Sequence, residues 1–277
     1  MKISPSTFYY KTKNSRTAKE KADADLRDKI ETIQTEFHHA GYRQVKVHLQ
    51  RKWNMTVNWK KIRRVMNKYS LYARVKKQFI STTNSNHPFI VYPNLISGLE
   101  VTDINQVWVS DITYIRIATG FVYLAVIIDI FSRRVVGWGI SKNIDHDLTT
   151  QALTAAIKFR KPAAGLIHHS DRGVQYACRE YVKILNENNI AISMSAKGNP
   201  YENAFAESFM KTIKKEEVYL WEYENIWDVL ERIPLFIEQV YNKKRLHSGI
   251  GYLPPEEFEE IIKYDTKIKE QAQILLK

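Results

Sequence analysis

The feature that most constrains the fold is a change of pattern at Gln106. Beyond it lie three segments rich in apolar, β-branched and aromatic residues, and a short Ala-Thr-Gly turn separates the first two. Such segments predict consecutive strands connected as hairpins. Their sequences are QVWVSDITYIRI, FVYLAVIIDI and RRVVGWGIS. Three antiparallel strands in succession are therefore expected.

Helix and strand alternate after the third strand. The patterns predict a helix around 147–159, a strand at GLIHHS, a helix near 174–188, a strand at IAISMS and a long helix from about Asn203. The predicted order is βββαβαβα. Three antiparallel strands followed by alternating helices and strands give a mixed sheet with helices on its faces. The expected fold class is α/β, with the arrangement of a ribonuclease H-like domain.

The first 72 residues have helical periodicity instead. The apolar residues of three successive segments are Leu26, Ile30, Ile33 and Phe37, then Tyr42, Val45 and Leu49, then Trp59, Ile62, Val65, Met66 and Tyr69. The other face of the third segment carries Lys60, Lys61, Arg63, Arg64, Asn67 and Lys68. Two short helices joined by a turn, the second with a cationic face, are typical of a helix-turn-helix that enters a DNA major groove. A plain helical bundle with a solvated basic face is the alternative.

The charge of the chain is concentrated at its beginning. Residues 1–100 hold 20 Lys and Arg against 7 Asp and Glu, a balance of +13, whereas residues 101–277 hold 22 against 23, a balance of −1. A front third with all the excess positive charge indicates a DNA-binding module attached to a domain with another role. A basic surface that serves only solubility is the alternative.

The same patterns predict the division of the chain. Residues 73–100 have no periodicity and contain a Ser/Thr/Asn cluster, two prolines and a glycine, which is typical of a linker or extended arm. We therefore expect a helix-turn-helix domain at 1–72, a linker at 73–100, the α/β core at 101–220 and a C-terminal helical extension at 221–277. Pro234 is expected to kink the helix of that extension.

Several classes of protein are disfavoured. The longest apolar run, residues 121–128, is far shorter than the roughly 18 residues that a membrane span needs, and no signal-peptide pattern opens the chain. The single cysteine, Cys178, excludes an intramolecular disulfide framework and a zinc site of several thiolates. A soluble intracellular protein is expected.

Three carboxylates stand out from the predicted elements. Asp111 lies inside the first strand, where an ionised carboxylate needs a compensating charge or strong hydrogen bonds. Asp171 follows the GLIHHS strand, at the sheet edge where α/β folds place ligands, and Glu207 lies on the helix after the last strand. From these positions the three side chains could converge on a pair of hard divalent cations. For Asp111 alone, a hydrogen-bonded structural role is an equal alternative.

Other polar residues near these three are expected to be structural. Asp129 could line the sheet, and Glu202 precedes the long helix, where a negative charge offsets the helix dipole. His168 and His169 end a strand, where packing and polar contacts are commoner than metal ligation.

Two lysines share a helix face with Glu207. Lys211 and Lys214 follow it at i+4 and i+7. There they could hold a DNA phosphate against bound metals without entering the coordination sphere. The alternative is a surface ion pair worth only tenths of a kcal/mol.

With these residues identified, the chain resembles the transposases of bacterial insertion sequences, specifically the second-reading-frame product, in the retroviral-integrase superfamily. WVSDITYI, HSDRGVQY and GNPYENAFAESFMKTIKKE are similar to the three catalytic segments of that family. GYRQVKVHL is similar to its helix-turn-helix, and YNKKRLHSGIGYLPPEEF to its C-terminal signature. The resemblance covers nearly the whole chain, and all five motifs occur in the family's order.

The resemblance implies a function and a set of partners. Asp111, Asp171 and Glu207 would be the catalytic, metal-binding triad, and Lys214 would be the DNA-contacting basic residue. The implied reaction is cleavage at the element's 3′ end followed by strand transfer, with two Mg²⁺ ions, for which Mn²⁺ substitutes. The implied partners are double-stranded DNA of the terminal inverted repeats and the target, further copies of the chain as a dimer or higher oligomer, and the upstream-frame protein by fusion or association. The implied location is the bacterial cytoplasm, at the nucleoid.

Two other functions fit the same residues. A non-catalytic DNA-binding regulator could use the α/β body as a scaffold, although the three carboxylates oppose this. A nuclease of the same fold could hydrolyse DNA without joining it, and strand-transfer products would separate the two.

Overall fold

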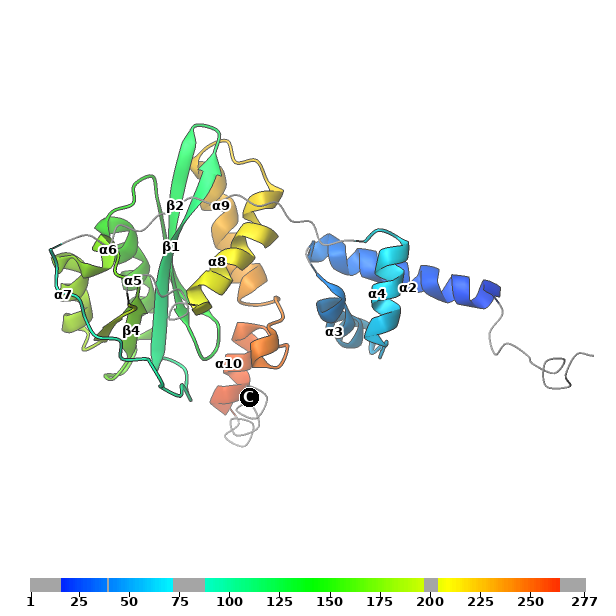
Figure 1. Ribbon diagram of the computed structural model, residues 1–277, viewed down its shortest axis with the longest axis horizontal. Helices are drawn as coiled ribbons and strands as arrows, with labels where there is room; N and C mark the ends of the chain where they lie inside the picture. Colours follow the sequence, from blue (N-terminus) through cyan, green and yellow to red (C-terminus); the bar gives the residue numbers. More distant parts are fainter. Residues whose placement is uncertain (1–15, 39, 72–87, 197–203, 265–277) are drawn as a thin grey trace, which may run out of the picture. The chain divides into compact units, whose positions relative to one another are not determined.

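The protein was analysed as a computed structural model that describes residues 16–38, 40–71, 88–196 and 204–264 (Figure 1). It consists of two compact units, which divide between Val75 and Lys76. The predicted position of Glu202 lies outside the described residues. No helix in the described ranges is long and apolar enough to cross a membrane.

The first unit is a bundle of three helices, α2 (Arg16–Glu36), α3 (Tyr42–Trp53) and α4 (Trp59–Lys68). The predicted apolar stripes meet in one core, which includes Leu26, Ile30, Ile33, Val45, Leu49, Ile62, Val65 and Met66. Asn54 ends α3 in the left-handed conformation, and the Asn58 side chain caps α4 by accepting from the Lys60 N–H. The N-terminal helical domain predicted from the sequence is confirmed.

The second unit is built on a five-stranded mixed sheet. Its strands are β1 (Val107–Ile117), β2 (Gly120–Asp129), β3 (Val135–Ser141), β4 (Ile167–Ser170) and β5 (Ala191–Met194), in the spatial order β3-β2-β1-β4-β5. The first three strands pair antiparallel, whereas β4 pairs parallel with both β1 and β5. This is the predicted ribonuclease H-like sheet, and β1 lies at its centre.

Helices cover both faces of the sheet (Figure 1). On one face, α5 (His146–Arg160), α6 (Val174–Ala177) and α7 (Arg179–Glu187) share a core with even-numbered residues of β1 such as Trp108 and Ile112. On the other face, α8 (Ala204–Glu216) and α9 (Ile226–Leu235) share a core with odd-numbered residues such as Val109 and Ile115. The period-2 alternation of a strand explains this division.

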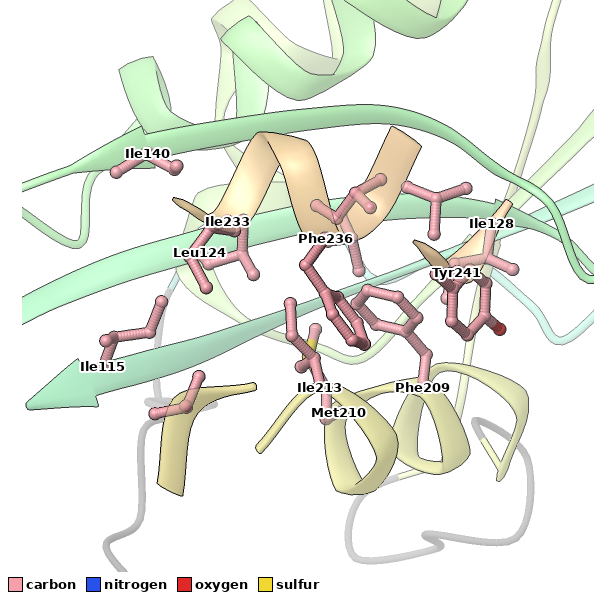
Figure 2. Packing of buried hydrophobic residues seen from close by; sticks show 14 of the residues in the cluster. Ile115, Leu124, Ile128, Ile140, Phe209, Met210, Ile213, Ile233, Phe236 and Tyr241 are labelled. Atoms are coloured by element: carbon pink, nitrogen blue, oxygen red, sulfur yellow. The ribbon is translucent and has the colours of Figure 1, made fainter. Parts of the chain in front are cut away.

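The segment after residue 220 belongs to the same core as the sheet. Ile233 of α9 and Phe236 face Phe209, Met210 and Ile213 of α8 in the layer against the sheet (Figure 2). The short elements that follow α8 and α9 are 3-10 turns at Val218–Leu220 and Ser248–Ile250, a π-helical segment at Phe236–Tyr241, and α10 (Pro255–Tyr264). Residues 221–264 are therefore packed into the α/β unit and do not stand apart from it.

The disturbance expected at Pro234 is a change of helix type. Proline has no N–H to donate, and its ring collides with the carbonyl four residues earlier. The α-helix ends one residue later, at Leu235, and the chain continues as the π-helical segment.

Part of the predicted linker lies against the sheet. The Leu95 N–H donates to Ser193 Oγ of β5 over 2.8 Å, and Phe89 and Tyr92 pack against the core beneath α7. Residues 72–87, the rest of that stretch, lie outside the described residues.

Candidate functional site

Asp111 is a half-buried carboxylate in the central strand. It lies opposite Val126 of β2, and its Oδ1 accepts a hydrogen bond from the Ile112 N–H over 2.8 Å. Burial raises the pKa of Asp111 to about 7, and the charges of Asp171 and Glu207 both contribute to this shift. The structure thus brings the three predicted carboxylates into electrostatic contact.

The parallel pairing of β4 with β1 positions Asp171. The register places Val109 beside His169, and Asp171 follows directly after Ser170, the last residue of β4, on the strand next to that of Asp111. Asp171 Oδ1 accepts from the Gly173 N–H over 2.9 Å. A Cβ on Gly173 would lie 2.9 Å from that same oxygen, so a larger residue would displace the carboxylate. Gly173 is a site residue that sequence reasoning did not single out.

Glu207 comes from the first turn of α8, which is anchored through Phe209, Met210 and Ile213 (Figure 2). Its Oε2 accepts from Lys211 Nζ over 3.0 Å. The Lys211 side chain is 76% exposed. Glu207 and Lys211 therefore form the surface i,i+4 ion pair that the sequence offered as the alternative. The exposed Lys211 ammonium remains accessible.

Lys214 is in a different environment from Lys211. Its Nζ lies 4.1 Å from the centroid of the Tyr114 ring on β1, a cation–π contact. Burial lowers the pKa of Lys214, and the charge of Asp111 opposes that shift. Lys214 is therefore a partly desolvated cation beside the carboxylates. Tyr114 was not found from the sequence, because only this contact across 100 positions connects it with the site.

A buried tyrosine lies below the carboxylates on the other side of the sheet. Burial raises the pKa of Tyr176 well above its usual value, and the charges of Asp171 and Asp111 add to the effect. Tyr176 packs edge-on against Tyr181, which bonds His168 Nε2 over 2.9 Å. Tyr176 and Tyr181 therefore belong to the buried core that α5, α6 and α7 share with the sheet.

The other polar residues considered from the sequence have structural partners. Asp129 is fully buried and accepts from the N–H groups of Asn105, Phe131 and Ser132 over 2.6, 3.0 and 3.1 Å. His169 Nδ1 lies 2.8 Å from Ser193 Oγ, and burial lowers the pKa of His168 to about 3. These contacts agree with the structural roles expected for Asp129 and the histidine pair.

The basic face of the first unit is formed as predicted along α4. All six side chains are exposed, namely Lys60, Lys61, Arg63, Arg64, Asn67 and Lys68. Arg64 also holds α4 to α2, because its guanidinium binds both carboxylate oxygens of Asp23 over 2.6 and 2.8 Å. These bonds lower the pKa of Asp23. Lys60, Lys61 and Arg63 form no ion pair with any described residue.

Comparison with known proteins identifies both units. Residues 102–200 and 188–255 match integrase core domain families, and residues 20–79 match an HTH-like domain family. The transposase for insertion sequence element IS904 of Lactococcus lactis is 36% identical over 85% of this chain and 93% of its own length. The chain belongs to the insertion-sequence transposase family.

Two further relatives match a shorter part of the chain. A 31 kDa protein of insertion element IS600 from Shigella sonnei is 39% identical over 72% of this chain and 74% of its own length. Transposase InsF of IS3A from Escherichia coli is 36% identical over 73% of this chain and 70% of its own length. The family resemblance inferred from the sequence motifs is confirmed.

The donor set of the transposase fits hard divalent cations. Its three candidate ligands are carboxylates. Burial first, and the charges of Asp171 and Glu207 in addition, raise the pKa of Asp111, and a bound cation would offset both effects. In the described ranges no three His, Cys, Asp or Glu side chains already surround one point. The carboxylates therefore lie close enough to interact but would have to turn toward a bound ion.

Proposed function

We propose that the chain cleaves DNA at the 3′ end of an insertion sequence and joins the freed 3′-hydroxyl to another phosphodiester. The observation that carries the proposal is the effect of Asp171 and Glu207 on the pKa of Asp111. A strand, a strand end and a helix bring three carboxylates near one another in a family of transposases.

Asp111, Asp171 and Glu207 would hold two Mg²⁺ ions, for which Mn²⁺ substitutes. Bound there, the ions would supply Lewis acidity for the attacking and leaving oxygens of an in-line displacement. The protein's own contribution is to fix the carboxylates on rigid elements. Asp111 is fixed by the pairing of β1 with β2 and β4, and Glu207 by the packing of α8.

The cations of α8 would orient the DNA. Lys214, held over Tyr114, would bind a phosphate beside Asp111, and Lys211 would bind one further out. In the first step water attacks phosphorus and the 3′-oxygen leaves with a proton. In the second step that 3′-oxygen attacks a phosphodiester, loses its proton and displaces another 3′-oxygen. Neither step needs a covalent bond to the protein.

The first unit would supply affinity for DNA. The exposed cations of α4 suit phosphates flanking a major groove, where Asn67 could reach base edges. We expect terminal inverted repeats and target DNA as substrates, a homo-oligomer that holds two ends together, and the upstream-frame protein as a further partner. Since the named relatives come from bacteria, we place the activity in the bacterial cytoplasm, at the nucleoid.

The test is a cleavage and joining assay with the purified chain. End-labelled duplex from the flanking inverted repeat is incubated with Mg²⁺ or Mn²⁺ and resolved on denaturing gels. We expect 3′-end nicks and joined strands for the wild type and for Glu231→Gln, an exposed α9 control, but neither product for Glu207→Gln.

Each alternative has its own result. Nicks without joined strands would indicate a nuclease of the same fold. DNA that is bound but never cut, even with the upstream-frame segment fused to the chain, would indicate a regulator on an inactive scaffold. Cleavage retained by Glu207→Gln would remove Glu207 from the catalytic set.

A further inference from the structure

A pocket of 460 Å³ opens beside the start of α8, and none of the three candidate carboxylates lines it. Its walls come from the segment before β1, the turn between β2 and β3, and the first turn of α8. Most of the lining is apolar, namely Ile96, Leu99, Val101, Ile130, Phe131 and Phe205. A volume in this range with few polar groups is typical of a site for a small molecule or a single group of a polymer.

Among the described residues, Arg133 is the one charged side chain that lines the pocket. Its guanidinium carbon lies 3.9 Å from the centroid of the Phe205 ring. Its Nε is buried without a hydrogen bond in the described part of the chain. Burial lowers the pKa of Arg133, and no described carboxylate counteracts that shift.

The neighbouring arginine, unlike Arg133, has carboxylate partners in the described part of the chain. Arg134, in the same turn, donates to Glu256 and Glu259 of α10, over 3.0 Å in each case. The turn therefore contains one arginine with two carboxylate partners and one with none among the described residues. A half-buried guanidinium without a counterion destabilises a fold. Among the described residues, the contact with Phe205 offsets part of that cost, but no carboxylate does.

The backbone at Arg133 adds to this cost. Its φ is +64°, in the left-handed region that residues other than glycine rarely adopt. Strained backbone of this kind persists where the surrounding structure enforces it, and it is enriched at ligand sites. The strained turn directs the guanidinium over Phe205, only two residues before Glu207.

We propose that this pocket binds one unstacked nucleotide of the DNA substrate, with its phosphate on Arg133 and its base against the apolar wall. This proposal rests on the proposed function, because it assigns one nucleotide of the same DNA substrate to a second site, apart from the three carboxylates. No described carboxylate offsets the charge of the Arg133 guanidinium, and guanidinium–phosphate pairs are strong and specific. The apolar wall does not suit a duplex backbone, which is polar throughout, but it suits the faces of a base released from its stack.

The test is photo-crosslinking in EDTA, so that no catalysis is required. A fluorescein-labelled single-stranded oligonucleotide carrying 5-iodouracil is bound to the full chain, irradiated and mapped by mass spectrometry. We expect cross-links in the tryptic peptides that contain Phe131 or Phe205. Arg133→Gln should weaken binding measured by anisotropy about tenfold and remove these cross-links. Arg133→Lys should partly restore them.

The matched control is Arg116→Gln, an exposed arginine at the opposite end of β1 from Val107. It should leave affinity and cross-links unchanged. Thermal unfolding of each variant checks the fold. Because Arg133→Gln loses the contact with Phe205 but no described counterion, it should melt within a few degrees of the wild type. A much larger fall in melting temperature would mean that the arginine mainly supports the fold, which overturns the proposal.

The outcomes separate this inference from the proposed function. Cross-links that map elsewhere, or that survive Arg133→Gln, refute the pocket even when the same preparation cuts and joins DNA with Mg²⁺. Cross-links in the pocket without any cleavage support the nucleotide site and count against the transposase chemistry.

Discussion

Asp111 illustrates how a candidate catalytic residue can oppose the stability of its own fold. Burial and two neighbouring carboxylates all disfavour its charge, and only the Ile112 N–H and Lys214 oppose them. Because the folded-state pKa of about 7 lies above the usual 3.8, the ionised side chain destabilises the metal-free fold fully above pH 7. This penalty shrinks as the pH falls from 7 toward 4.

We predict that Asp111→Asn abolishes strand cleavage and stabilises the metal-free protein. At pH 8 in EDTA the free energy of unfolding should rise by about 1–3 kcal/mol, since a neutral amide removes most of the electrostatic penalty. Calorimetry would measure this as an increase in melting temperature of several degrees. The control is Asp147→Asn, whose side chain is 82% exposed. An Asp111→Asn variant that melts below the wild type would contradict the proposed origin of the pKa shift.

His48 predicts a pH dependence for the first unit. It is buried in α3 with its ring stacked on Phe37 at 4.4 Å, and burial lowers its pKa from 6.5 to about 4. The unfolded chain therefore binds a proton between pH 6.5 and 4 that the folded unit does not. The free energy of unfolding of the first unit should therefore fall by about 3 kcal/mol as the pH falls from 6.5 to 4.

The measurement is thermal unfolding of the full chain by near-UV circular dichroism between pH 4 and 7. His48→Leu should flatten the pH dependence of the transition assigned to the first unit, whereas His38→Leu, at an exposed position, should leave it unchanged. The assignment would be wrong if both variants kept the wild-type profile.

At the scale of elements, β3 and α5 pack closely against each other in the second unit. A Cβ added to Gly137 would lie 2.3 Å from the Ala152 carbonyl oxygen and 2.7 Å from Ala156 Cβ. The helix backbone itself occupies the space that a side chain would need. Glycine at this position therefore sets how near α5 can approach the sheet.

Gly137→Ala should consequently push α5 away from β3 and lower the free energy of unfolding by about 3 kcal/mol or more. Urea unfolding followed by tryptophan fluorescence would measure the change. Gly41→Ala is the comparison, because nothing lies within 4 Å of its added Cβ, and it should cost about 1 kcal/mol or less as an N-cap change. Equal losses in the two variants would rule out backbone crowding as the cause.

Features carried by local pattern were predictable from the sequence, whereas features that depend on distant contacts were not. The alternation in β1 and the helical stripe through Ile62 and Val65 predicted their elements, because period and burial coincide there. Asp111 could be selected as a candidate site residue because a carboxylate interrupts an otherwise apolar strand. Tyr114 and Arg133 did not, because their roles depend on Lys214 and Phe205, which lie far away along the chain.

The packing of the C-terminal segment is a second example. A helix periodicity shows that one face is apolar but not what covers it. The face of α9 lies against α8 and the sheet, and Asn242 bonds both the N–H and the carbonyl of Val135 over 3.0 Å. Neither partner is close in sequence, so residues after 220 looked like an extension of the core.

At the scale of the whole molecule, charge and chemistry lie in different units. Residues 1–75 form the first unit and hold 18 Lys and Arg against 6 Asp and Glu, a balance of +12, whereas the three carboxylates lie in the second unit, which holds 24 of each. Under the proposed function, such a division would separate affinity from catalysis, because counterion release by the basic unit would supply binding that is independent of the carboxylates. It also allows the two contributions to be altered one at a time.

The salt dependence of DNA binding should therefore follow the first unit. Replacing Lys60, Lys61, Arg63 and Lys68 together by Gln removes four exposed cations of α4 and spares Arg64, which also holds Asp23. Affinity for terminal-repeat duplex should fall, and the slope of log K against log salt should decrease by up to about 0.9 for each phosphate that the protein no longer neutralises. Anisotropy titrations over a range of salt concentrations would measure both quantities.

The matched control changes the charge by the same amount on the other unit, at the exposed residues Lys142, Lys158, Lys183 and Lys243. If the basic face of α4 binds the backbone, this control should keep most of the wild-type slope. An equal loss in both variants would mean that net charge alone attracts the DNA. The helix-turn-helix would then have no special part in binding, and the basic bundle without a recognition role, considered from the sequence, would be the better description of the first unit.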